Sequence, residues 1–154
     1  MPTITDHAIA TPDKPAFIMG SSGEAVTFAE LDARANQIAQ LLRASGVQTG
    51  EHIAMMLKNC REFFEVVFGC ARAGVVFTPI STHLKQDETA YIINNCNARL
   101  FIASASLGEV ASEAAQHAPD LVRKFIIGGE AAGVEEWQTA VSEPSTDPNA
   151  DQSR

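Results

Sequence analysis

Short apolar runs alternate with segments of helical periodicity along most of this sequence. Each run is apolar throughout and not only at every second residue, so a strand that it forms is buried on both faces. Such strands need helices on both sides of the sheet and are joined by right-handed crossovers. The sequence therefore predicts an α/β fold with a mostly parallel sheet and flanking helices. The predicted strands are residues 52–57, 75–80, 100–103 and 124–127.

A β-hairpin is expected ahead of this alternating region. Residues 16–19 and 25–28 are two short apolar runs around Gly20-Ser21-Ser22-Gly23, a composition typical of a turn. A phosphate-binding loop is disfavoured here, because no lysine follows and the next element is a strand and not a helix. Residues 1–15 are polar and hold three prolines, which predicts an N-terminal surface segment.

The first predicted helix has a start signal, a buried face and a stop signal. Thr27-x-x-Glu30 is a capping box, in which each side chain satisfies the backbone N–H of the other residue. Gly46 can supply the left-handed residue that ends the helix. The spacing of three and four residues predicts one apolar stripe made of Phe28, Leu31, Ala35, Ile38 and Leu42.

Four further helices follow between the strands. Asn59-x-x-Glu62 predicts the start of the second helix, which Gly74 ends. Its inward side chains are expected to be Phe63, Phe64, Val67, Phe68 and Ala71. The remaining helices are predicted at residues 86–95, 106–117 and 134–141.

Charge and composition exclude several classes of function. The net charge is −8, of which −5 lies in residues 129–154, and this argues against a nucleic-acid or anionic-membrane surface. Residues 16–141 are expected to form one α/β subdomain, followed by an acidic polar linker at 142–154. The most apolar region, 66–80, holds an arginine and a proline and is too short for a membrane span.

The three cysteines and four histidines show no spacing typical of a metal site. Cys60, Cys70 and Cys96 lie beside apolar or helical sequence, so they are expected to be free thiols in a reducing cytoplasm. No secretory signal is visible at the N-terminus. A cytoplasmic location is therefore expected.

The carboxyl ends of parallel strands are the usual place for a ligand, but here they carry no nucleotide-binding fingerprint. His83-x-x-x-Asp87 superficially matches an acyltransferase pair, with the histidine as base. The structural alternative is that Asp87 and Glu88 lie in the first turn of a helix and favour its dipole. Residues 78–81 either line a cavity or form a strand end broken by proline. No catalytic, cofactor-binding or metal-binding residue is predicted.

Six short segments follow one another in a familiar order between Thr11 and Ile127. They are Thr11-Pro12-Asp13-Lys14-Pro15-Ala16, Val26-Thr27-Phe28-Ala29-Glu30-Leu31 with Ala35-Asn36 following, Gly46-Val47-Gln48-Thr49-Gly50-Glu51-His52-Ile53-Ala54, Leu57-Lys58-Asn59-Cys60-Arg61-Glu62-Phe63, Ala73-Gly74-Val75-Val76-Phe77-Thr78-Pro79-Ile80 and Ala98-Arg99-Leu100. In order and spacing they resemble the N-terminal part of the AMP-forming acyl-CoA synthetases, which belong to the adenylate-forming superfamily. One departure is Ser81, where the family commonly has asparagine before a threonine or proline.

The resemblance implies a two-step reaction, in which a carboxylate attacks ATP to give an acyl-adenylate and CoA then displaces AMP. ATP, Mg²⁺ and CoA would serve the full-length enzyme. The family's phosphate-gripping loop, its later acidic nucleotide-binding motif and its catalytic lysine match no position in this sequence.

The expectation is therefore an N-terminal fragment of a ligase that activates a carboxylic acid, with a leaning towards fatty acids. The fragment alone is predicted to be inactive and to bind none of these cofactors. Its expected partner is the remainder of the enzyme, and exposed apolar surface predicts self-association. The alternative is an independent, non-catalytic α/β binding or interaction module.

Overall fold

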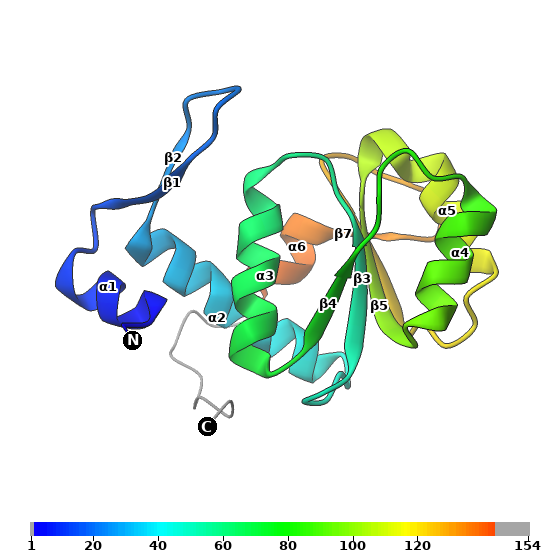
Figure 1. Cartoon of the computed structure of the whole chain (residues 1–154), viewed down its shortest axis with the longest axis horizontal. Helices are drawn as coiled ribbons and strands as arrows, with labels where there is room; N and C mark the ends of the chain where they lie inside the picture. Colours follow the sequence, from blue (N-terminus) through cyan, green and yellow to red (C-terminus); the bar gives the residue numbers. More distant parts are fainter. Residues whose placement is uncertain (1, 144–154) are drawn as a thin grey trace.

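The computed structural model describes residues 2–143, which form an α/β body and a small hairpin unit beside it (Figure 1). The strands are β1 (Pro15–Ile18), β2 (Ala25–Thr27), β3 (His52–Met56), β4 (Val76–Pro79), β5 (Ala98–Ser104), β6 (Arg123–Ile127) and β7 (Glu135–Glu136). The α-helices are α1 (Ile4–Ala10), α2 (Phe28–Ala44), α3 (Arg61–Ala73), α4 (Gln86–Asn95), α5 (Gly108–Gln116) and α6 (Trp137–Ser142). The expected linker at 142–154 lies, from residue 144 on, outside the described residues.

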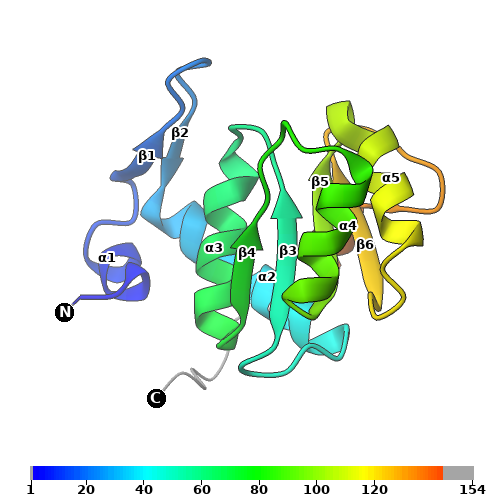
Figure 2. The same ribbon diagram turned by 45° about the vertical axis from the view of Figure 1, so that its right-hand side comes forward.

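The body is a five-stranded sheet in the order β4-β3-β5-β6-β7, with every neighbouring pair parallel (Figure 2). In Figure 1, α2, α3 and α6 cover one face, while α4 and α5 cover the other. β1 and β2 pair antiparallel in a separate two-stranded sheet. The predicted α/β class, with its parallel sheet, flanking helices and N-terminal hairpin, is confirmed.

Successive residues of the central strands enter two different hydrophobic clusters. In β3, Ile53 and Met55 pack with α2 and α3, whereas Ala54 and Met56 pack on the side of α4 and α5. The same alternation occurs in β5, β6 and the helices that face them. Continuous apolar runs in the sequence are therefore explained by burial on both faces of each strand.

Helices α2 and α3 lie unusually close together at one glycine. Thr27 and Glu30 form the expected capping box of α2, with the Thr27 N–H donating to Glu30 Oε2 at 2.8 Å. The predicted stripe is buried at Leu31, Ala35, Ile38 and Leu42. On α3, a Cβ atom at Gly69 would lie 2.4 Å from Cγ2 of Ile38, so only glycine fits this contact.

The prediction for α3 is wrong in its cap and only partly right in its buried face. Phe63 and Val67 pack against the core as expected, whereas Phe64 and Ala71 are exposed. Cys60, and not Asn59, is the N-cap, and its side chain makes no capping hydrogen bond. Phe64 is 42 % exposed, because its ring turns towards Phe17 of the hairpin at a centroid distance of 4.8 Å. The fully buried residues of α3 are Glu65, Val66, Gly69, Cys70 and Ala73. At the close approach to α2, the position of Gly69 faces Ile38 and the carbonyl oxygen of Ala35.

Several short elements differ from the sequence expectation. Residues 4–10 form α1, whose capping box consists of Thr3 and Asp6 and whose residues are all at least partly exposed. The two-residue strand β7 was not predicted, and α6 begins at Trp137 and not at residue 134. A 3₁₀ turn, 105–107, precedes α5. Each of these pieces is too short to leave a periodic signal in the sequence.

The Gly69→Ala substitution is expected to destabilise the fold by about 1–3 kcal/mol, because the added methyl group overpacks the α2–α3 contact. This loss outweighs the helix-forming advantage of alanine, since Cβ of Ile38 is rigidly tied to its backbone. Urea unfolding followed by circular dichroism measures the change. Gly20→Ala is the control, because nothing lies within 4 Å of its Cβ position. Equal midpoints for the two variants would contradict the packing argument.

Candidate functional site

The loops after β3, β4, β5 and β6 meet at one edge of the sheet, because all four strands run parallel. The backbone N–H of Lys58, after β3, donates to Oγ of Ser104 at the end of β5, at 2.9 Å. Ser104 is 8 % exposed, so this hydrogen bond fixes the two loops to each other inside the structure. Gly129, after β6, lies next to the same region, since a Cβ there would approach Cβ of Ala105 to 2.9 Å.

His83 and Asp87 do not form a catalytic pair in the described structure. Both side chains are exposed, and no hydrogen bond or ion pair among the described residues joins them. Asp87 and Glu88 lie in the first turn of α4, where the N–H of Lys85 donates to Glu88 Oε2 at 3.0 Å. The structural alternative is therefore correct: these carboxylates favour the helix dipole.

Residues 78–81 do not line either of two hollows on the described part of the chain. One hollow is a shallow depression beside α4, lined by Leu84, Asp87, Glu88, Tyr91 and Ile92. The other lies between the hairpin and α3. Thr78 and Pro79 complete β4, so the interpretation of 78–81 as a strand end limited by proline is supported.

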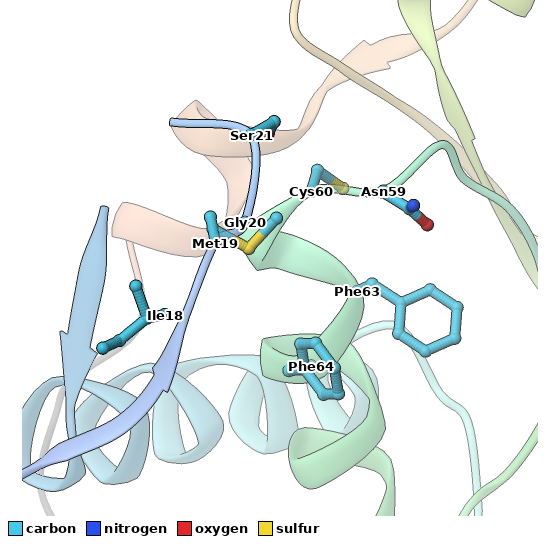
Figure 3. A pocket seen from close by; sticks show the side chains of 8 residues that line it. All are labelled: Ile18, Met19, Gly20, Ser21, Asn59, Cys60, Phe63 and Phe64. Carbon is cyan, nitrogen blue, oxygen red and sulfur yellow. The ribbon is translucent and has the colours of Figure 1, made fainter. Parts of the chain in front are cut away.

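The hollow between the hairpin and the start of α3, which we call the hairpin groove, has a volume of about 440 Å³ (Figure 3). Its lining residues are Ile18, Met19, Gly20, Ser21, Asn59, Cys60, Phe63 and Phe64. Burial raises the pKa of the Cys60 thiol to about 11, so the thiol is almost entirely protonated at neutral pH and reacts slowly while it is buried. The groove is mainly apolar and holds no acid–base pair.

A buried carboxylate lies behind the hairpin groove. The side chain of Glu65 is 1 % exposed and accepts a hydrogen bond from Nε of Arg61 at 2.9 Å, with Nε of Arg34 at 3.5 Å. Arg61 also binds Glu24 of the hairpin at 2.6 Å. Burial raises the pKa of Glu65, against the lowering effect of the two arginines. This cluster joins the hairpin and α2 to α3, which lies farther along the sequence.

Sequence reasoning missed both the hairpin groove and the Glu65 cluster. Arg61 and Glu65 stand four residues apart, so their ion pair on one helix face could have been inferred from spacing. Glu24 and Arg34 carry no such signal, because only the tertiary fold brings them to α3.

Within residues 2–143, no three histidine, cysteine or acidic side chains gather to hold a metal ion. The helices of this part of the chain are also too short or too polar to cross a membrane. What the described residues form is a sheet edge where four loops meet and a mainly apolar groove.

A family model described as "AMP-binding enzyme" matches residues 4–153 of the chain. The chain belongs to this family. The resemblance to the adenylate-forming acyl-CoA synthetases, drawn from the order of short segments, is thereby confirmed. The family match does not depend on a single segment, because it extends over nearly the whole sequence.

Two curated relatives illustrate the relation. A crotonobetaine/carnitine–CoA ligase of Citrobacter koseri is 35 % identical over 134 residues, which are 85 % of this chain and 26 % of the relative. A long-chain-fatty-acid–CoA ligase of Mycobacterium tuberculosis is 27 % identical over 150 residues, 96 % of this chain and 30 % of the relative. The chain thus spans less than a third of the length of either relative.

Solved structures share the fold. An anthranilate–CoA ligase in complex with anthranoyl-AMP matches 97 % of this chain with a TM-score of 0.88 and 24 % identity, over 29 % of its own chain. A long-chain-fatty-acid–CoA ligase structure from Rhodopseudomonas palustris matches 96 % with a TM-score of 0.84 and 23 % identity, over 37 % of its own chain. At these identities the likeness establishes the architecture of the described residues.

Replacing Ser104 by alanine is expected to destabilise the chain by about 1 kcal/mol, because the N–H of Lys58 loses its acceptor. Hydrogen exchange at the Lys58 amide should accelerate at the same time. Thermal unfolding and amide exchange measure the two effects. Ser106→Ala, at an exposed position in the same loop, should change neither quantity. An unchanged exchange rate in Ser104→Ala would show that this hydrogen bond does not hold the loops.

The raised pKa of Glu65 predicts a pH-dependent contribution to stability. Because the folded protein binds this proton more tightly than the unfolded chain, the contribution is present below the ordinary pKa of 4.5 and is lost as pH rises through the folded pKa. Relative to Glu65→Gln, the wild type should therefore lose stability as the pH rises from 4 towards neutral.

Urea midpoints of the wild type and Glu65→Gln at several pH values test this sign. Glu113→Gln is the control, since this glutamate is exposed on α5 and should leave the pH profile of the wild type unchanged. A constant difference between the wild type and Glu65→Gln across the range would refute the raised pKa.

Proposed function

We propose that this chain is the N-terminal subdomain of an ATP-dependent, AMP-forming acyl-CoA ligase. The observation that carries the proposal is the family match across residues 4–153, together with curated relatives named as CoA ligases. The complete enzyme would join a carboxylate to AMP with release of pyrophosphate, and CoA would then displace AMP to give a thioester. Within this assignment, residues 16–141 are the folded subdomain and 142–154 the linker to the rest.

ATP, Mg²⁺ and CoA belong, in this proposal, to the complete enzyme and not to the present chain alone. The strand-end loops after β3, β4, β5 and β6 carry no phosphate-gripping sequence. Their described role is structural, as in the Lys58–Ser104 hydrogen bond. The proposal therefore assigns the groups that stabilise the charge on the phosphates during adenylation to the rest of the enzyme.

The proposed acid is a fatty acid, and the name of the M. tuberculosis relative supports it. The C. koseri relative, with the higher identity, is named for crotonobetaine and carnitine, so these acids are the principal rivals in any substrate test.

The proposed partner of this chain is the remainder of the ligase. Six large apolar side chains are exposed on the described surface, namely Ile9, Ile18, Phe64, Val76, Tyr91 and Val122. Phe64 and Ile18 lie together at the hairpin groove, and exposed apolar surface of this kind is typical of an interface. When the chain is alone, the same surface would support self-association.

Residues 1–154 incubated with ATP, Mg²⁺ and a fatty acid are expected to show no exchange of radiolabelled pyrophosphate into ATP. A chimera in which these residues replace the matching part of the C. koseri ligase should regain exchange, since the subdomain then has its catalytic partner. The acid panel includes palmitate, crotonobetaine and carnitine.

A boiled sample of the isolated chain and the unmodified C. koseri ligase are the negative and positive controls. Exchange by the isolated chain above the boiled sample would overturn its assignment as a subdomain without catalytic groups. A soluble, folded chimera with no exchange for any acid would overturn the assignment to the ligase.

A further inference from the structure

The base of the hairpin is firmly attached to the body. The N–H of Phe28 donates to the carbonyl oxygen of Lys14 at 3.0 Å, and that of Ala29 to Pro12 at 3.1 Å. Val26, in β2, is fully buried. These contacts anchor the residues on both sides of the hairpin to the start of α2, so the hairpin cannot move away as a whole without breaking backbone hydrogen bonds.

The tip is closed on itself but loosely held by the body. The N–H of Met19 donates to the carbonyl oxygen of Glu24 at 2.8 Å, and that of Gly23 to Met19 at 2.8 Å. Among the described residues, the tip reaches α3 through one ion pair, Glu24 to Arg61 at 2.6 Å. Glu24 is 45 % and Arg61 29 % exposed at their side chains, so water and salt reach this ion pair.

Arg61 has two separate partners, so its ion pair with the tip can break while its ion pair in the core remains. Its Nε binds the buried Glu65, while its Nη1 binds Glu24. When Glu24 leaves, Arg61 still neutralises Glu65, so no buried charge loses its counterion. Phe17, in β1 directly before the tip, contacts the ring of Phe64, and this ring contact is the second attachment of the hairpin to α3. Phe64 is already 42 % exposed. Opening the tip therefore disturbs little of the packed interior.

We propose that the hairpin tip, residues 18–24, is a hinged lid over the hairpin groove, latched by the Glu24–Arg61 ion pair. Opening uncovers Cys60, Phe63 and Phe64 at the start of α3, which the tip residues Ile18 to Ser21 face across the groove in Figure 3. The inference concerns the motion of this chain and does not depend on the ligase assignment.

Cys60 provides a natural probe of this motion, because it lines the groove and is half-buried. In the 1–154 chain, alkylation of Cys60 by iodoacetamide is followed by mass spectrometry of its peptide. Glu24→Gln removes the charge of the latch. Because an exposed ion pair contributes little free energy, this variant should accelerate Cys60 alkylation only about two- to fivefold at low salt. Rising salt should accelerate the wild type towards the rate of the variant, and leave the variant unchanged.

Three controls separate lid opening from general unfolding. Cys70 is fully buried in α3, so its continued protection shows that the body remains folded. Glu113→Gln, on α5, should leave the rate at Cys60 unchanged. Phe17→Leu weakens the second attachment without touching a charge, and should accelerate Cys60 alkylation at every salt concentration.

Equal rates at Cys60 in the wild type, Glu24→Gln and Phe17→Leu would overturn the proposal. So would parallel acceleration at Cys60 and Cys70, because the chain would then open globally. Selective acceleration at Cys60, sensitive to salt only while Glu24 is present, would support the lid.

Discussion

The rest of the structure depends on burial of the two central strands, β3 and β5, on both faces. Ile53, Met55, Leu100 and Ile102 pack under α2 and α3, while Ala54, Met56, Phe101 and Ala103 pack under α4 and α5. A strand buried in this way has no solvent face, so a helix must lie on each side and consecutive strands must run parallel. Strand direction then decides that the loops after β3, β4, β5 and β6 share one edge.

Two buried polar groups, Ser104 and Glu65, connect segments that are separated in the sequence. Ser104 joins the loops after β3 and β5 by accepting from Lys58, and Glu65 is held between Arg61 and Arg34. Both lie in surroundings where an unpaired group is costly, so their partners are fixed in position. Arg61 extends the second feature to the hairpin through Glu24. The hairpin groove owes its shape to this contact and to the aromatic rings at the start of α3.

Most of the fold could be predicted from local patterns, and the errors have a common cause. The capping box of Thr27 and Glu30, the stop at Gly74 and the apolar runs of the major strands are local signals, and the structure contains each of them. The buried face of α3 was predicted only in part: Phe63 and Val67 pack against the core as expected, but Phe64 does not. Its ring contacts Phe17 of the hairpin instead, a partner that the sequence pattern of α3 cannot reveal.

The sequence by itself determined the α/β class, the hairpin and the family, because these depend on the periodicity, order and spacing of residues along the chain. Only the tertiary structure decided which residues form the hairpin groove and which charges surround Glu65. Glu24, Arg34 and Arg61 come from three different elements, and their meeting depends on how the hairpin, α2 and α3 pack together. Such contacts join positions that no local pattern relates, so they follow from packing geometry and not from spacing in the sequence.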